Sequence, residues 1–197
     1  MGLIAFLILF PFVAAFILAC MRKSGPVRKY TMFVFCAVIM AAVLYFSATS
    51  LLNGETVSYL PETHLINTGM LVIEWFLMGL IIYQSYCALL SVAQTGLITW
   101  LELSGKSELP GNHILSDKLT IIMCLIIGIV GCLICVYAMG YMKDYHTHHT
   151  EFRDRRSFFF SMLFVFLGAM FGLVFSCNLT WIYFFWEITS VCSFLLI

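Results

Sequence analysis

Long apolar runs separated by short polar segments dominate the chain and decide the fold that it predicts. The clear runs hold about 18–24 apolar residues, and a helix of that length, rising 1.5 Å per residue, crosses the roughly 30 Å hydrocarbon core of a bilayer. The expected helices are 3–21, 30–52, 69–84, 87–103, 119–142, 158–175 and 179–197. No Lys or Arg lies inside any of these ranges. The pattern therefore predicts an all-α, polytopic helical membrane protein with a single membrane domain of about 6–7 transmembrane helices.

The stretch 69–103 has two interpretations, because it is mostly apolar and is interrupted near its start by Glu74 and near its middle by the Gln84-Ser85 pair. One helix would reach about 52 Å, which exceeds the hydrocarbon core, whereas a hairpin of two short tilted helices fits it. With a hairpin, the segments Arg22–Lys29 and Lys143–Arg156 share one side and hold eight of the ten Lys and Arg residues. A single helix would split them six to four. Since basic loops favour the cytoplasm, we expect the hairpin, an N-terminus outside and a cytoplasmic loop at 143–156.

Composition and charge agree with a membrane location. The chain is 62% hydrophobic and 10% charged, whereas soluble domains are about 25% charged. Its formal net charge is zero, so nothing points to nucleic acid as a partner. We expect a multi-pass protein of the cell (cytoplasmic) membrane, surrounded by lipid.

Glu187 is the main candidate for function, because it is the only formal charge between Arg156 and the C-terminus. A carboxylate at the centre of a membrane helix costs roughly 2.5–3.5 kcal/mol on insertion scales. Such a residue is a proton carrier, a member of a structural ion pair, or a residue tolerated near an interface. Its position near the middle of its helix weighs against the last. A carboxylate that alternates between apolar and cation-paired surroundings can accept and release a proton.

Glu74 is the second candidate for proton translocation. It lies about five residues into its predicted helix, so its side chain is expected to reach the interface. Polar side chains of the same hairpin could hydrogen-bond with it or with one another. They are Tyr83, Gln84, Tyr86 and Gln94.

No metal or cofactor site is expected in this chain. Cys132 and Cys135 form a CxxC, but a structural zinc or iron–sulfur site needs about four ligands and no second pair exists. His146, His148 and His149 share the basic loop with acidic residues, where a solvated segment is favoured over a zinc site. All five histidines lie in predicted loops, which argues against a membrane haem because its axial ligands come from helices. No catalytic residue is apparent either.

Residues 137–197 carry a family resemblance. The matching motifs, in order, are Tyr137-Ala-Met-Gly-Tyr-Met-Lys-Asp144, Arg156-Ser-Phe-Phe159, Asn178-Leu179, Phe185-Trp186-Glu187 and Cys192-Ser-Phe-Leu-Leu-Ile197. This segment resembles the antiporter-like membrane subunits of respiratory complex I and of the Mrp-type cation antiporters. It is most similar to the large antiporter-like subunit of energy-converting [NiFe] hydrogenases. Asp117 is similar to an acidic residue that the family often has before the corresponding helix.

The resemblance implies a function for the chain as part of a larger assembly. Such subunits translocate protons or sodium ions and are coupled to ferredoxin- or NADH-driven electron transfer, and their key helix glutamate maps onto Glu187. The implied partners are other membrane subunits and peripheral hydrogenase or ferredoxin-oxidising subunits. The chain would be a subunit of an oxidoreductase complex and not catalytic alone.

The resemblance also has a limit, because the lysines that pair with this glutamate in the family lie in further helices that do not follow here. We therefore expect an N-terminal portion, truncated at its C-terminus, that does not translocate ions alone. The alternative is a short, non-conducting structural membrane subunit of such a complex, in which Glu187 only holds a pair between helices.

Overall fold

The computed structural model describes residues 2–21, 25–53, 56–59, 69–70, 72–75, 96–97, 99–100, 104, 113–148 and 155–196. Its long helices are α1 (Gly2–Cys20), α2 (Gly25–Asn53), α5 (Lys118–His148), α6 (Arg156–Phe175) and α7 (Leu179–Leu196). Two short strands, β1 (Thr56–Tyr59) and β2 (His113–Ser116), pair antiparallel, with Thr56 opposite Ser116.

The membrane character of the fold is confirmed. Helices α1, α2, α5 and α6 are long and apolar enough to span a membrane, and α7 adds a shorter apolar stretch, Trp181–Leu196. The chain is thus an all-α polytopic membrane protein apart from the small sheet. The predicted helices 69–84 and 87–103 lie largely outside the described residues, as do Tyr83, Gln84, Tyr86 and Gln94.

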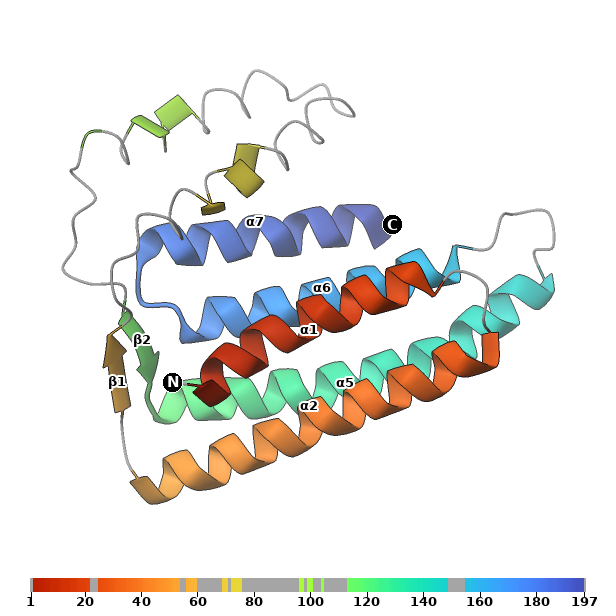
Figure 1. The fold of residues 1–197 in the computed structure, drawn as a ribbon, viewed down its shortest axis with the longest axis horizontal. Coiled ribbons are helices and arrows are strands. Elements are labelled where there is room, and N and C mark those ends of the chain that lie inside the picture. Colours follow the sequence, from red (N-terminus) through yellow and green to blue (C-terminus); the bar gives the residue numbers. More distant parts are fainter. Residues whose placement is uncertain are drawn as a thin grey trace.

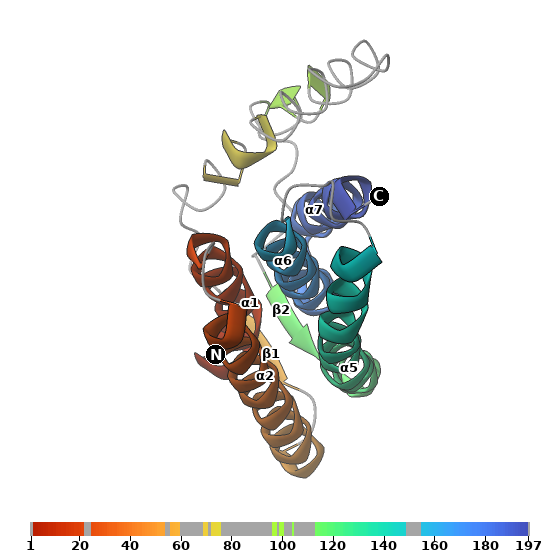
Figure 2. The ribbon, with the colours of Figure 1, turned by 90° about the vertical axis from the view of Figure 1, so that its right-hand side faces the viewer.

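Helix α6 lies at the centre of the bundle (Figure 1). It contacts α1 on one side and α7 on the other, and α2 packs along α5. Figure 2, which looks along the helices, shows α6 between α1 and α7. The interior is apolar and rich in phenylalanine, with Phe164, Phe171 and Phe175 fully buried on α6. Helix α6 therefore supplies the centre of the core.

Large apolar side chains also cover the outside of the bundle. Phe16 is 71% exposed and Tyr137 is 75% exposed, and both lie on helices that are apolar all round. In water such a surface would be unfavourable, but lipid tails are as apolar as these side chains. The outward face is therefore the surface expected of helices in a bilayer.

Glycines allow two of the helix pairs to approach closely, as small residues do in membrane helices. A Cβ built at Gly128 on α5 would lie 2.6 Å from a methyl group of Val43 on α2. A Cβ at Gly172 on α6 would lie 2.4 Å from the ring of Phe185 on α7. Gly128 and Gly172 therefore let α5 lie close to α2 and α6 lie close to α7.

The described residues of the two basic segments lie at the same end of the bundle. Figure 1 shows that α1 ends, α2 begins, α5 ends and α6 begins on one side, and that the sheet lies on the other. The end of α2 and the start of α5 are therefore at the same end, joined by β1 and β2. This arrangement is what the hairpin interpretation of 69–103 requires, although that segment is mostly outside the described residues.

The predicted helix boundaries were wrong at the end of the bundle that holds the basic residues. The expectation that no Lys or Arg lies in a helix was also wrong. Helix α2 begins at Gly25 rather than at 30, and α5 continues from Lys118 to His148 rather than ending at 142. Arg28, Lys29 and Lys143 are consequently helical. Apolar runs end where the hydrocarbon ends, whereas a helix continues into the interface, where long basic side chains extend their charged ends toward water.

Two smaller expectations also need correction. His146 and His148 belong to the last turns of α5, and His113 belongs to β2, so not all histidines lie in loops. Part of the predicted loop 53–68 forms β1, because pairing with β2 satisfies backbone groups that a loop would leave to water.

Candidate functional site

Helix α7 positions the candidate carboxylate. The helix follows α6 after a short turn at Ser176, Cys177 and Asn178, so it packs back against α6. One side of α7 forms an apolar cluster with Ala169 of α6, and Ile8 and Phe12 of α1 pack against that cluster. We call it the α7 cluster. Its α7 members are Trp181, Phe184, Phe185, Ile188 and Cys192.

Glu187 is the ninth of the 18 residues of α7. At 1.5 Å per residue it lies about 12 Å from the start of the helix, near its middle. Its side chain is only 9% exposed, although its neighbour Trp186 is 62% exposed. The carboxylate is therefore on the protein side of α7 and not on its outer face.

The two carboxylate oxygens of Glu187 have different surroundings. The Tyr183 hydroxyl donates a hydrogen bond of 2.5 Å to Oε1. Oε2 is buried and makes no hydrogen bond with any residue that the structure describes. Within the same residues Glu187 forms no ion pair with Lys or Arg. One oxygen is thus fixed along the helix, and the other is available to a proton or a hydrogen-bond donor.

The sequence analysis missed Tyr183 as a partner of Glu187. The signal was present, because residues four apart lie on the same side of a helix and can pair. Tyr183 and Glu187 stand four residues apart in WIYFFWE. The site therefore consists of an i, i+4 tyrosine–glutamate pair beside the α7 cluster.

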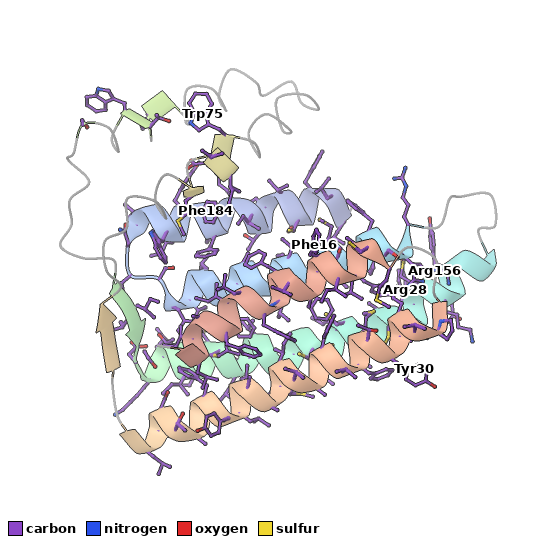
Figure 3. All side chains as sticks on the ribbon, in the orientation of Figure 1. Phe16, Arg28, Tyr30, Trp75, Arg156 and Phe184 are labelled. Atoms are coloured by element: carbon purple, nitrogen blue, oxygen red, sulfur yellow. The ribbon has the colours of Figure 1, made fainter. Side chains whose placement is uncertain are left out.

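Glu74 was expected to reach the interface, but its side chain is buried, with 3% exposure. It belongs to the short helical segment 72–75. Met70, four residues earlier, packs against the α7 cluster, and Figure 3 shows Trp75 in the segment beside α7, where Phe184 is labelled. Glu187 is hydrogen-bonded within the described residues only to Tyr183. The structure therefore brings the segment of Glu74 near α7 without joining the two carboxylates.

The cysteines of the CxxC lie in the membrane part of α5. Cys132 and Cys135 are buried, and the Cys132 thiol donates to the carbonyl oxygen of Cys36 on α2 at 3.6 Å. All the described cysteines are free thiols. Among the described residues no group of three or more His, Cys, Asp or Glu is placed to hold a metal ion.

Comparison with known proteins points to one group of membrane subunits. Residues 100–153 match the family described as NADH-ubiquinone oxidoreductase (complex I), chain 5 N-terminus. The Na(+)/H(+) antiporter subunit A1 of Staphylococcus haemolyticus is 32% identical over 126 residues, which cover 62% of this chain and 15% of that protein.

Two chloroplast relatives extend the comparison. The NAD(P)H-quinone oxidoreductase subunit 5 of Poa pratensis is 46% identical over 83 residues, which cover 42% of this chain and 11% of that protein. The same subunit of Zygnema circumcarinatum is 30% identical over 133 residues, which cover 68% of this chain and 17% of that protein. The chain thus spans less than a fifth of the length of these curated relatives. By these matches it is related to the N-terminal portion of the antiporter-like, complex I-related membrane subunits.

Proposed function

We propose that this chain is part of a proton- or sodium-translocating membrane subunit and that Glu187 is its proton-handling residue. The observation that carries the proposal is the buried carboxylate in the middle of α7, of which one oxygen accepts a hydrogen bond and the other does not. Tyr183 holds Oε1, while Oε2 has no hydrogen bond within the described residues. An ionisable group in such a place is a functional candidate because leaving it there is costly.

The likeness to antiporter and quinone-oxidoreductase subunits supports the same proposal. One relative is named as an Na(+)/H(+) antiporter subunit and the others as quinone oxidoreductase subunits, so the names give ion exchange for the first and redox chemistry for the others. We propose that the chain acts with other membrane subunits in a complex I-like or membrane-bound hydrogenase assembly, driven by ferredoxin or NADH. The hydrogenase assignment is supported by the motifs at 137–197.

The proposed orientation follows from the basic end of the bundle. Arg28, Lys29, Lys143 and Arg156 lie at the end where α2 and α6 begin. The positive-inside rule puts that end in the cytoplasm and the N-terminus of α1 outside. Glu74 remains a second candidate for the proton path, because its segment packs near α7 and it is buried.

The test is Glu187→Gln in membranes that contain the complete assembly. Inverted vesicles are energised with the electron donor, and a pH-sensitive dye reports proton uptake while donor oxidation is followed separately. Glutamine preserves size and the hydrogen bond from Tyr183 but carries no exchangeable carboxyl proton. We expect proton uptake to be abolished while the assembled complex is present in normal amount.

A matched control comes from the same helix. Ser190 is exposed, and its hydroxyl only donates to the carbonyl oxygen of Trp186, so Ser190→Ala should leave proton uptake unchanged. Normal uptake by Glu187→Gln would sink the assignment and favour a non-conducting structural role. Tyr183→Phe should lower uptake partially, since it removes the group that orients Oε1 without removing the carboxyl.

A further inference from the structure

A basic pocket lies at the end of the bundle where α2 and α6 begin, far along α5 from the sheet. Its volume is about 620 Å³, and it is lined by residues of α2, α5 and α6. Four of its lining residues are Arg28, Lys29, Lys143 and Arg156. Figure 3 shows Arg28 and Arg156 at this end of the bundle. Three helices that are distant in sequence thus bring their positive charges to one cavity.

The charge of the pocket favours an anion. Among the residues that the structure describes, its lining contains no Asp or Glu, although Asp144 follows Lys143 on α5. Lys29 on α2 and Lys143 on α5 are both exposed in this lining, and an anion between them would be attracted by both positive charges. Helices α2 and α6 also both begin here, and helix N-termini carry a partial positive charge that attracts phosphate.

Arg28 is held in place by its neighbours. It is only 5% exposed, and its Nη1 donates a hydrogen bond of 2.8 Å to the hydroxyl of Ser157 on α6. Its guanidinium also lies 5.9 Å from the centre of the Phe160 ring. Ser157 in turn donates to the carbonyl oxygen of Met21 at 3.2 Å. A guanidinium fixed in this way is pre-organised for a phosphate oxygen, because little side-chain entropy remains to be lost.

The other part of the lining is apolar. Met32 and Phe33 of α2, Met139 of α5 and Phe160 of α6 lie on the side of the pocket toward the middle of the helices. A ligand with a phosphate group and an acyl chain would place its phosphate among the basic residues and its acyl chain against these apolar side chains. Basic pockets between membrane helices at the cytoplasmic surface suit anionic lipid headgroups.

We propose that this pocket binds a phosphate group, supplied by an anionic phospholipid whose acyl chain follows the apolar lining. The proposal is independent of ion translocation, because it concerns a different end of the molecule from Glu187. A soluble phosphate ester would offer the same headgroup chemistry, and the experiment separates the two sources.

The experiment measures binding of labelled phosphatidylglycerol to the complete subunit in nanodiscs of phosphatidylcholine. The test variant is Lys29→Gln with Lys143→Gln, since both side chains are exposed and their removal should leave the bundle folded. The control is Lys118→Gln, an equally exposed lysine at the opposite end of α5. Each lysine near a phosphate is expected to contribute about fivefold, so the double variant should bind roughly 25-fold more weakly. The control should bind like the unaltered protein.

A competition arm uses free glycerol phosphate, and circular dichroism checks that the variants keep their helix content. Displacement of the lipid only by unlabelled phosphatidylglycerol supports the lipid source. Displacement by millimolar glycerol phosphate would overturn the lipid source in favour of a soluble phosphate ester. Equal binding by the double variant and the control would overturn the pocket assignment. Arg156→Gln, measured in the same way, gives a second, independent test if the double variant loses helix content.

Discussion

Buried polar groups have different hydrogen-bond partners in two regions of the molecule. One region is the four-helix bundle of α1, α2, α5 and α6, and the other is helix α7. In the bundle, two such groups are held by bonds between helices, since Arg28 donates to Ser157 and the hydroxyl of Ser161 donates to the carbonyl oxygen of Ala15, whereas Ser47 donates within α2. In α7, the buried carboxylate is bonded only along its own helix within the described residues. These bonds between helices stabilise the bundle. The Glu187 carboxylate on α7 is costly to bury, and its place there is explained by the proposed function.

The largest loss of stability is expected from the centre of the bundle. Phe164 is fully buried on α6, and its ring packs edge-on against that of Phe35 on α2. Phe164→Ala should lower the free energy of unfolding by about 3–5 kcal/mol, because it removes these contacts and leaves a cavity. Unfolding by SDS titration in mixed micelles measures the loss. The outward-facing Tyr137→Ala should cost far less, and an equal cost would contradict the assignment of Tyr137 to the lipid surface.

An effect of the opposite sign is expected from α7. Glu187→Leu removes a carboxylate that costs energy to bury, so the same titration should show a gain of up to about 2.5 kcal/mol, the hydrogen bond from Tyr183 offsetting part of the full insertion cost. Ion translocation should be lost in this variant. A clear loss of stability would instead mean that the carboxylate holds helices together, and the contrast with the bundle would disappear.

The junction between the two regions is tested at Gly172. Gly172→Ala would place a methyl group 2.4 Å from the Phe185 ring, and Phe185 is itself buried. Overpacking of this kind costs about 1–3 kcal/mol. Gly140→Ala is the matched control, because nothing lies within 4 Å of its added methyl group. We expect the control to be neutral or slightly stabilising, since alanine favours helix over glycine. Equal effects in the two variants would show that α7 does not depend on this contact.

A smaller effect is expected from the hydrogen bond between α1 and α6. Ser161→Ala removes the donor to the Ala15 carbonyl oxygen, a type of bond worth about 0.6 kcal/mol on average between membrane helices. Ser193→Ala on α7 is the control, because its hydroxyl is exposed and donates only within its own helix, to the carbonyl oxygen of Thr189. A change of several kcal/mol in Ser161→Ala would show that this bond is unusually important for the bundle.

The smallest effect is expected at the start of α5. Hydrogen bonds from the side chain and the backbone amide of Thr120 hold the pKa of Asp117 below its usual value of 3.8. Because the folded-state pKa is the lower one, this contribution is complete above the usual pKa and is lost as pH falls through the folded one. Between about pH 5 and pH 3, the melting temperature should fall slightly more for the unaltered protein than for Asp117→Asn. Parallel pH profiles would exclude this role for Asp117.

The membrane fold could be predicted from the sequence because helix length and apolarity decide whether a segment crosses a bilayer. The ends of the helices could not, since α2 and α5 extend past their apolar runs into the interface. The helix that packs against each helix could not be predicted from the sequence either. Nothing in the pattern of apolar residues pairs Ser161 with Ala15 or Gly172 with Phe185. Strand pairing between 56–59 and 113–116 joins segments too far apart in sequence for a local signal.

The site was predictable in its main residue only. Glu187 stands alone as a charge in an apolar segment, and that isolation was enough to single it out. The tyrosine that hydrogen-bonds to it lies four residues earlier, so this pair could be predicted from helical spacing. The burial of Glu74 could not, because position along a helix does not specify which way the side chain faces a neighbour.

The pairing of β1 with β2 has a consequence for how α2 and α5 are held together. β1 begins three residues after the end of α2, and β2 ends two residues before the start of α5. The small sheet therefore fixes these two helix ends relative to each other, in addition to the side-chain packing along the helices. A proline within β1 that removes a hydrogen bond between the strands would loosen this end of the bundle and leave the end where α2 and α6 begin unchanged.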